Sequence, residues 1–122
     1  MAKTVLTVDD SKTMRDMVTF TLKSAGYDVV EAEDGVKALG IAMAKDIDVV
    51  ITDLNMPNMN GIDLIKALRK NSKYTRSPIL MLTTEGDSSK KEEGKIAGAT
   101  GWIVKPFEPA KLAEVIKKVC PI

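Results

Sequence analysis

The chain contains no histidine, a single cysteine (Cys120) and few aromatic residues, which make up 4% of its 122 positions. The lack of histidine excludes Ser-His-Asp and Cys-His catalysis and removes a usual ligand of zinc sites. One cysteine cannot form an internal disulfide, which is typical of proteins of the reducing cytoplasm. Any acid–base or metal chemistry must therefore depend on Asp, Glu, Lys and backbone groups.

Long apolar runs and a strong charge bias are also absent. No run approaches the roughly 20 residues that span a bilayer, and residues 1–4 show no signal-peptide core. The formal net charge of +1 gives no overall field that would favour nucleic acid or an anionic membrane. We therefore expect one cytoplasmic domain over residues 1–122, with no nucleic-acid or membrane partner.

Five short apolar segments, rich in β-branched residues, alternate with segments of helical periodicity. The predicted strands are Thr4–Val8, Asp28–Val30 with its flanks, Val49–Thr52, Ile79–Leu82 and Trp102–Val104. Their apolar residues follow one another directly, which is typical of strands buried on both faces of a parallel sheet. The repeats predict an α/β fold of the (βα)5 type with right-handed crossovers and helices on both faces.

Apolar residues three or four positions apart identify the helices. The expected stripes are Met14, Met17, Val18, Thr21, Leu22 and Ala25; Val36, Leu39 and Met43; Leu64, Ile65 and Leu68; and Leu112, Val115, Ile116 and Val119. Gly26 is expected to end the first helix, Asp34 to begin the second and Pro109 the last. The fourth helix, about Ser88–Ala97, is mostly charged and interrupted by glycines, so we expect it to be short, exposed and mobile.

Polar residues stand where four of the predicted strands end. Asp9 and Asp10 follow the first strand, Asp53 the third, Thr83 the fourth and Lys105 the fifth. In open α/β sheets, sites form outside the carboxyl ends of the strands. Taken alone, these residues would be helix caps, turn residues or solvated surface charges. Together, two carboxylates near 4 Å repel by up to ~4 kcal/mol at an effective dielectric constant of 20, so the cluster requires a cation.

Oxygen ligands without His or Cys select a hard ion, Mg²⁺ or a close relative. Asp53 can then act as a carboxylate nucleophile toward a phosphoryl group. Phosphoryl transfer needs alignment and positive charge around the equatorial oxygens. Mg²⁺ on Asp10 and Asp53 would provide that charge together with Lys105, and the Thr83 hydroxyl would add a hydrogen bond.

The sequence resembles the CheY family of receiver domains over essentially its whole length. The matching elements, in order, are Asp9-Asp10, the segment Asp53-Leu54-Asn55-Met56-Pro57-Asn58-Met59-Asn60-Gly61, Thr83 and Lys105-Pro106-Phe107. The resemblance implies a flavodoxin-like fold with a five-stranded parallel sheet in the order 2-1-3-4-5. It also implies a cis bond between Lys105 and Pro106.

The resemblance further implies roles for the acidic residues. Asp53 would be the phosphoacceptor, and Asp10 and Asp53 would hold Mg²⁺ together with the backbone carbonyl of Asn55. Asp9 would act on the metal mainly through water. Pro57 and Gly61 shape a tight loop that can aim the Asn55 carbonyl at the ion.

Other roles implied by the resemblance concern phosphoryl contact and switching. Thr83 and Lys105 would contact the attached phosphoryl group. Trp102 stands at the aromatic switch position, where better-known members carry tyrosine, so a tyrosine hydroxyl bond of the active state is not available here. Asn55 and Glu85 occupy the positions that modulate hydrolysis of the acyl phosphate.

The implied function is a stand-alone response regulator, a monomer with no output domain, phosphorylated by a histidine kinase of the CheA kind. It would not be an enzyme in the usual sense, since it catalyses only its own phosphorylation and dephosphorylation. The stretch 94–102 is similar to a chemotaxis subgroup, so we expect the target to be a flagellar motor switch protein bound by the fourth helix, fifth strand and fifth helix.

Several alternatives stay open at this point. Within the receiver class, the protein could be a phosphate sink or a regulator of a non-motor pathway. A flavodoxin-like cofactor module would need a phosphate cradle after the first strand, where Asp9 and Asp10 would repel a flavin phosphate. A phosphatase of the haloacid dehalogenase type would place Asp-x-Asp there and would normally carry a cap domain.

Overall fold

The computed structural model describes residues 2–84 and 88–122, and five parallel strands form the centre of this part of the chain. The strands are β1 (Thr4–Val8), β2 (Asp28–Ala32), β3 (Val49–Thr52), β4 (Ile79–Thr83) and β5 (Gly101–Val104). They pair in the order β2-β1-β3-β4-β5, which confirms the predicted fold class and strand order.

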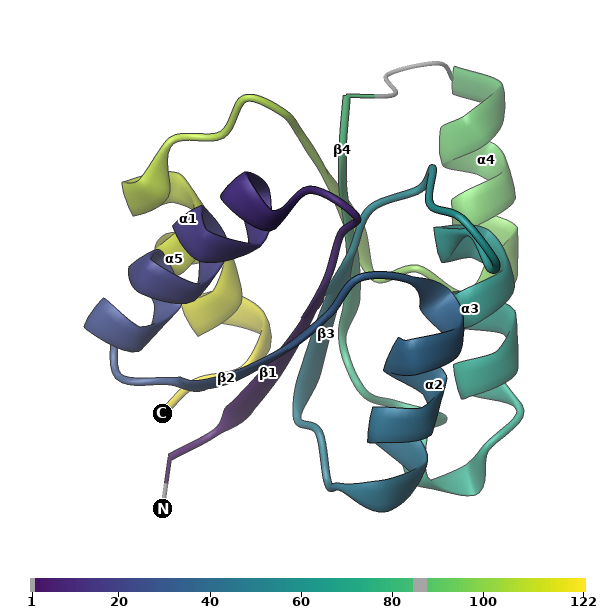
Figure 1. The fold of residues 1–122 in the computed structure, drawn as a ribbon, viewed down its shortest axis with the longest axis horizontal. Helices are drawn as coiled ribbons and strands as arrows, with labels where there is room; N and C mark the ends of the chain where they lie inside the picture. Colours follow the sequence, from purple (N-terminus) through teal and green to yellow (C-terminus); the bar gives the residue numbers. More distant parts are fainter. Residues whose placement is uncertain (1, 85–87) are drawn as a thin grey trace.

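Helices cover both faces of the sheet (Figure 1). The helices α1 (Lys12–Ser24) and α5 (Pro109–Val119) lie on one face, and α2 (Gly35–Ala44), α3 (Gly61–Arg69) and α4 (Ser88–Ala97) lie on the other. A short 3-10 helix, η1 (Ser72–Tyr74), precedes β4. The sheet thus separates two apolar cores, one against each layer. Among the described residues, no helix is long and apolar enough to cross a bilayer.

The strand register brings the carboxyl ends of the central strands together. Val8 of β1 pairs with Thr52 of β3, and the Asp53 N–H donates to the Val8 carbonyl at 2.9 Å. On the other side, Thr83 of β4 pairs with Val104 of β5. Residues that directly follow these positions therefore meet at one edge of the sheet.

Side chains predicted to begin helices do so. The Asp34 carboxylate accepts from the Lys37 N–H at the start of α2, and Pro109 occupies the first turn of α5. Gly26 follows the end of α1 with φ +102°, and Gly98 follows the end of α4 with φ +114°. These left-handed conformations suit glycine, which has no Cβ to clash with the backbone.

The predicted apolar stripe of α2 is wrong at Val36 and Met43 but correct at Leu39. Val36 is 53% exposed and Met43 is 62% exposed, whereas Ala38 and Ala42 are fully buried. The second helix packs against the sheet and α3 through these small residues, which allow close approach, while Leu39 is partly buried against the same core. In α1, similarly, Val18 is buried but Met17 is 44% exposed.

The fourth helix has the predicted bounds but Gly94 does not interrupt it. Gly94 is buried inside α4, and a Cβ there would lie 3.1 Å from the indole ring of Trp102. The residue is therefore needed for close packing of the helix on β5. Ile96, at 77% exposed, agrees with the predicted exposure of this helix.

Candidate functional site

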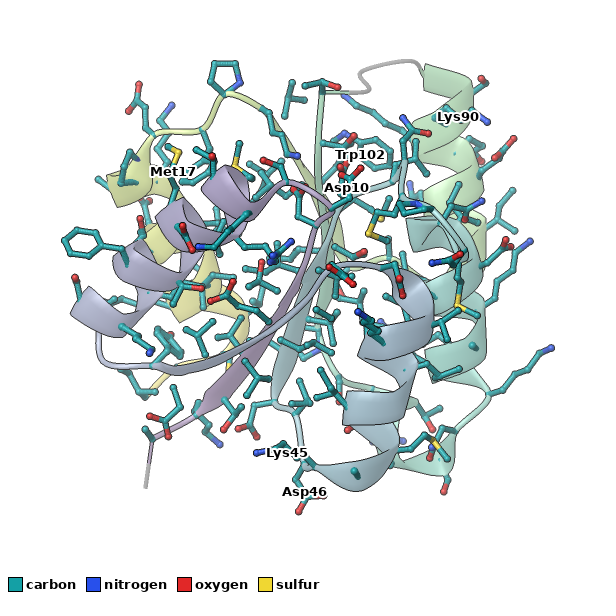
Figure 2. All side chains as sticks on the ribbon, in the orientation of Figure 1. Asp10, Met17, Lys45, Asp46, Lys90 and Trp102 are labelled. Atoms are coloured by element: carbon teal, nitrogen blue, oxygen red, sulfur yellow. The ribbon has the colours of Figure 1, made fainter. Side chains whose placement is uncertain are left out.

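Three carboxylates meet at the carboxyl ends of β1 and β3. Asp9, Asp10 and Asp53 each offer an oxygen, and these atoms lie within 4.8 Å of one another. Asp9 is 3% exposed and Asp53 9% exposed, while Asp10 faces solvent. Figure 2 shows Asp10 at this end of the sheet, opposite to the end that carries Lys45 and Asp46. The predicted convergence of the acidic residues is confirmed.

Lys105 contributes the positive charge of the cluster. Its Nζ lies 2.6 Å from Asp9 Oδ2 and 3.4 Å from Asp53 Oδ2, and its side chain is 10% exposed. Asp9 and Asp53 are separated from Lys105 by 96 and 52 positions, so only the fold brings these groups together. Three carboxylates and one ammonium leave a formal charge of −2, which equals the charge that one divalent cation neutralises.

The carboxyl group of Asp53 is partly desolvated and hydrogen-bonded. Burial raises its pKa above the ordinary value, and the nearby negative charge of Asp9 acts in the same direction. A hydrogen bond from the Thr83 side chain, the charge of Lys105 and the Leu54 N–H, 2.8 Å from Oδ1, oppose that rise. Thr83 therefore contacts the predicted phosphoacceptor, and its contact with an attached phosphoryl group stays a prediction.

A second layer of contacts fixes Asp9. The Ser11 N–H donates to Asp9 Oδ1 at 2.9 Å. The Arg15 guanidinium donates to the Asp9 carbonyl through Nη1 at 2.6 Å and pairs through Nε with Glu31 at 3.2 Å. Sequence reasoning missed Arg15, because an arginine in the first turns of a helix carries no signal of a partner at the end of β2.

The loop after Asp53 turns tightly because of Gly61. A Cβ at this position would lie 2.2 Å from the Asp53 carbonyl oxygen, so only glycine fits without a shift of the backbone. The Gly61 N–H donates to the Leu54 carbonyl at 2.9 Å and closes the loop. The bond between Lys105 and Pro106 is cis, as predicted.

The remaining predicted site residues lie around this cluster. Asn55 follows Asp53 by two positions and has an exposed side chain. Trp102 is partly buried on β5 and packs against the core beneath α2, α3 and α4. Glu85 lies outside the described residues, so its modulating role stays a prediction.

The donor set fits a hard divalent cation. All three converging groups are carboxylates, and neither a thiolate nor an imidazole is present to favour zinc. The open face at Asp10 leaves room for water ligands, which Mg²⁺ usually retains. A cluster of this kind is typical of the Mg²⁺ site of receiver domains.

The fold and this acidic site define a class. The sequence matches the family described as the response regulator receiver domain over residues 5–117, so the chain belongs to that family. The match therefore supports the receiver class over the two alternative classes, the flavodoxin-like cofactor module and the phosphatase of the haloacid dehalogenase type.

Particular relatives narrow the comparison to chemotaxis proteins. The chain is 47% identical to the chemotaxis protein CheY1 of Helicobacter pylori, over 94% of each protein. It is 45% identical to a CheY homologue of Campylobacter jejuni, over 94% of this chain and 90% of that protein.

Solved structures agree with these relatives. The chemotaxis protein CheY4 of Vibrio cholerae is 50% identical, with a TM-score of 0.94 over 98% of this chain and 99% of that chain. The receiver domain of a Pseudomonas aeruginosa sensor histidine kinase, solved with a magnesium ion coordinated in its active-site cleft, is 25% identical with a TM-score of 0.90 over 98% of each chain.

Proposed function

We propose that this protein is a single-domain response regulator of chemotaxis that accepts a phosphoryl group on Asp53. The observation that carries the proposal is the geometry of the acidic cluster, where Asp53 lies beside Asp9 and Asp10 and within 3.4 Å of the Lys105 ammonium. The similarity to chemotaxis proteins of matching length supports the pathway.

The proposed roles follow from these contacts. Asp10, Asp53 and the Asn55 carbonyl would hold Mg²⁺, and Asp9 would act on it mainly through water. When bound there, Mg²⁺ would offset the charge of the cluster and of the phosphoryl oxygens. Lys105, which now pairs with Asp9, would add its charge to the phosphoryl group.

The transfer step would use Asp53 as the nucleophile. One carboxylate oxygen forms a bond to phosphorus while the bond from phosphorus to a histidine nitrogen of the kinase breaks. The electron pair of the broken bond stays on that nitrogen, which takes up a proton from solvent. The Thr83 hydroxyl, which hydrogen-bonds the Asp53 carboxyl group before transfer, would then donate to a phosphoryl oxygen.

The proposed partners are a histidine kinase of the CheA type and a flagellar motor switch protein. For the target, we propose the face of α4, β5 and α5, where Trp102 lines two hollows of about 200 Å³ and 370 Å³. Lys91 and Lys95 border the smaller hollow, and Val104 is 44% exposed nearby. Such a surface suits a segment with both apolar and acidic side chains. We also propose a cytoplasmic location, because the kinase draws its phosphoryl groups from cytoplasmic ATP, and a monomeric state.

Phosphoryl uptake tests the proposal. Incubation with acetyl phosphate and Mg²⁺ should add one phosphoryl mass to the intact protein, and Asp53→Asn should abolish the addition. Asp46→Asn, a matched change of a 96% exposed carboxylate at the other end of the sheet, should leave it intact. Equal uptake by the Asp53→Asn variant would refute the assignment.

The target is tested separately with protein held active by beryllofluoride. We expect this form to bind the motor switch protein more tightly than the unmodified form, and Lys91→Glu to weaken the complex by charge reversal. Uptake of phosphoryl groups without any change in binding would favour a phosphate sink or a non-motor pathway.

A further inference from the structure

The loop that carries Asn55 is bonded to the start of α2 at two points. Asn58 donates from Nδ2 to Asp34 Oδ2 at 2.9 Å, and the Gly35 N–H donates to the Met59 carbonyl at 3.2 Å. Asp34 and Asn58 are 24 positions apart. The contact therefore joins the segment after β2 to the segment after β3, at the same end of the sheet as the acidic cluster.

Asp34 uses both of its oxygens and is 4% exposed. Its Oδ1 accepts from the Lys37 N–H at 2.9 Å, which is the ordinary bond of a helix N-cap. Its Oδ2 accepts from Asn58 and has no part in that cap. The bond from the Lys37 N–H, followed by the one from Asn58, holds the pKa of Asp34 below its usual range, so the carboxylate stays charged.

The backbone of Asn58 adopts a left-handed conformation that residues other than glycine and asparagine rarely adopt. Its φ is +69°, in the left-handed region where glycine is the favoured residue. Here the Met59 N–H donates to the Pro57 carbonyl at 2.7 Å, which closes a tight turn around Asn58. Glycine would also make this turn but has no side chain to reach Asp34, so the bond to Asp34 favours asparagine over glycine.

The loop and the helix are also in direct steric contact. A Cβ on Gly35 would lie 2.6 Å from the Met59 carbonyl oxygen and 2.7 Å from the Met59 Cβ. The start of α2 thus limits the positions that the loop can take. Asn55 lies inside this loop, between the bond that closes it at Leu54 and Gly61 and the contacts with α2.

We propose that Asp34 is a positioning residue of the metal site, which acts through Asn58 to hold the loop so that the Asn55 carbonyl is available to Mg²⁺. This inference rests on the proposed function. It gives Asp34 a role beyond helix capping: the same carboxylate begins α2 and orients a ligand of the ion.

The Asn58→Gly variant isolates this role, because it removes the bond to Asp34 and relieves the left-handed backbone. We expect the dissociation constant for Mg²⁺, measured by isothermal titration calorimetry, to rise at least about threefold. Loss of a hydrogen bond that orients a metal ligand typically weakens metal binding by roughly tenfold or more. The melting temperature in chelator should not fall. An unchanged dissociation constant would overturn the inference.

A double-mutant cycle separates positioning from capping. Asp34→Ala should weaken Mg²⁺ binding and also lower the melting temperature, because it removes the α2 cap as well. If Asp34 acts through Asn58, the Asp34→Ala change should have no further effect on the Mg²⁺ dissociation constant in the Asn58→Gly background. If the increases in the Mg²⁺ dissociation constant from the two single variants multiplied in the double variant, the two residues would act independently and the proposal would be contradicted.

Asn71→Gly is the matched control, since Asn71 caps η1 by accepting from the Lys73 N–H, far from the cluster. It should leave Mg²⁺ binding at the wild-type value, and a similar loss there would overturn the inference. If the wild-type protein bound no Mg²⁺, the proposed function would fail and this inference with it. Wild-type binding with no change in Asn58→Gly would refute the inference alone.

Discussion

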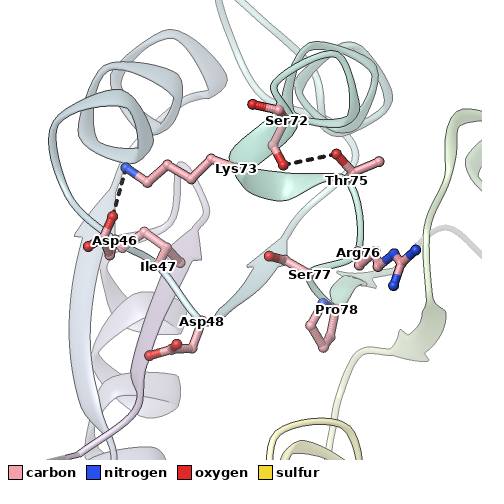
Figure 3. A pocket seen from close by; sticks show the side chains of 9 residues that line it. All are labelled: Asp46, Ile47, Asp48, Ser72, Lys73, Thr75, Arg76, Ser77 and Pro78. Atoms are coloured by element: carbon pink, nitrogen blue, oxygen red, sulfur yellow. Dashed lines mark hydrogen bonds and ion pairs between the residues drawn. The ribbon is translucent and has the colours of Figure 1, made fainter.

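At both ends of the parallel sheet, acidic and basic side chains gather in the loops (Figures 2 and 3). At the amino end, a hollow of about 750 Å³ is lined by the loops before β3 and β4, with two acidic residues, Asp46 and Asp48, and two basic ones, Lys73 and Arg76. At the carboxyl end lies the cluster of Asp9, Asp10, Asp53 and Lys105. Composition alone would not distinguish the two regions.

They differ in how their charges are balanced. At the amino end, Lys73 pairs with Asp46 at 3.1 Å and donates to the Lys45 carbonyl at 2.8 Å, while Asp48 accepts from the Thr4 N–H at 2.8 Å. These contacts satisfy hydrogen-bonding groups of the backbone at the start of β1 and in the loop before β3. At the carboxyl end, three carboxylates share one ammonium. An uncompensated charge therefore marks the site better than the size of a hollow does.

The largest expected difference between the two ends concerns their lysines. Lys105→Met should slow phosphorylation by acetyl phosphate at least about 100-fold, because one electrostatic contact to the transferring group is typically worth that much. Lys73→Met should leave the rate unchanged. Stopped-flow or mass-spectrometric time courses in saturating Mg²⁺ measure both variants, and equal rates would break the comparison.

A smaller difference concerns the carboxylates. Asp10→Asn should raise the Mg²⁺ dissociation constant at least about tenfold. In chelator it should stabilise the fold by roughly 1 kcal/mol or less, because it relieves repulsion that solvent partly screens. Asp48→Ala should instead destabilise by about 1 kcal/mol, through loss of the bond from the Thr4 N–H. Thermal melts in chelator compare the two, and destabilisation by Asp10→Asn would indicate a structural cap.

Asp9 differs from Asp10 in this respect. Its carboxylate is 5% exposed and pairs with Lys105 at 2.6 Å, so removal of its charge leaves a buried ammonium without its closest partner. We therefore expect Asp10→Asn, but not Asp9→Asn, to stabilise the fold in chelator.

The smallest expected effect is spectroscopic. Trp102 is the only tryptophan of the chain, and it lies on β5 and lines a hollow with residues of α4 and another with residues of α5. Beryllofluoride with Mg²⁺ should shift its emission to the blue and protect it from acrylamide if the indole turns inward on activation. The Asp53→Asn variant is the control and should show neither change. An unaltered spectrum while Asp53 is occupied would exclude Trp102 as the reporter of the switch.

The sequence predicted the fold and the cluster because the functional residues directly follow strands. Asp9, Asp53 and Lys105 each stand one position beyond a strand end, and parallel pairing places those ends together. The pairing of Lys105 with Asp9, across 96 positions, depends on side-chain directions that no local pattern encodes. The same holds for the bond from Asn58 to Asp34.

The failure on α2 has a physical cause as well. A count of large apolar residues favours the face of Val36 and Met43, but burial followed the small residues Ala38 and Ala42. A helix pressed closely against a sheet and a second helix selects for small volume at the contact. Sequence periodicity measures hydrophobicity and does not register the distance between packed elements.

The measurement that tests the central claim most directly is the position of the phosphoryl group and its dependence on metal. After incubation with acetyl phosphate, borohydride reduction and peptide mass mapping should find the modification at Asp53 in Mg²⁺ and at no residue in chelator. Modification of Asp46, Asp48 or another carboxylate, or equal labelling of Asp53 without metal, would contradict the account of a charge-unbalanced, magnesium-dependent site.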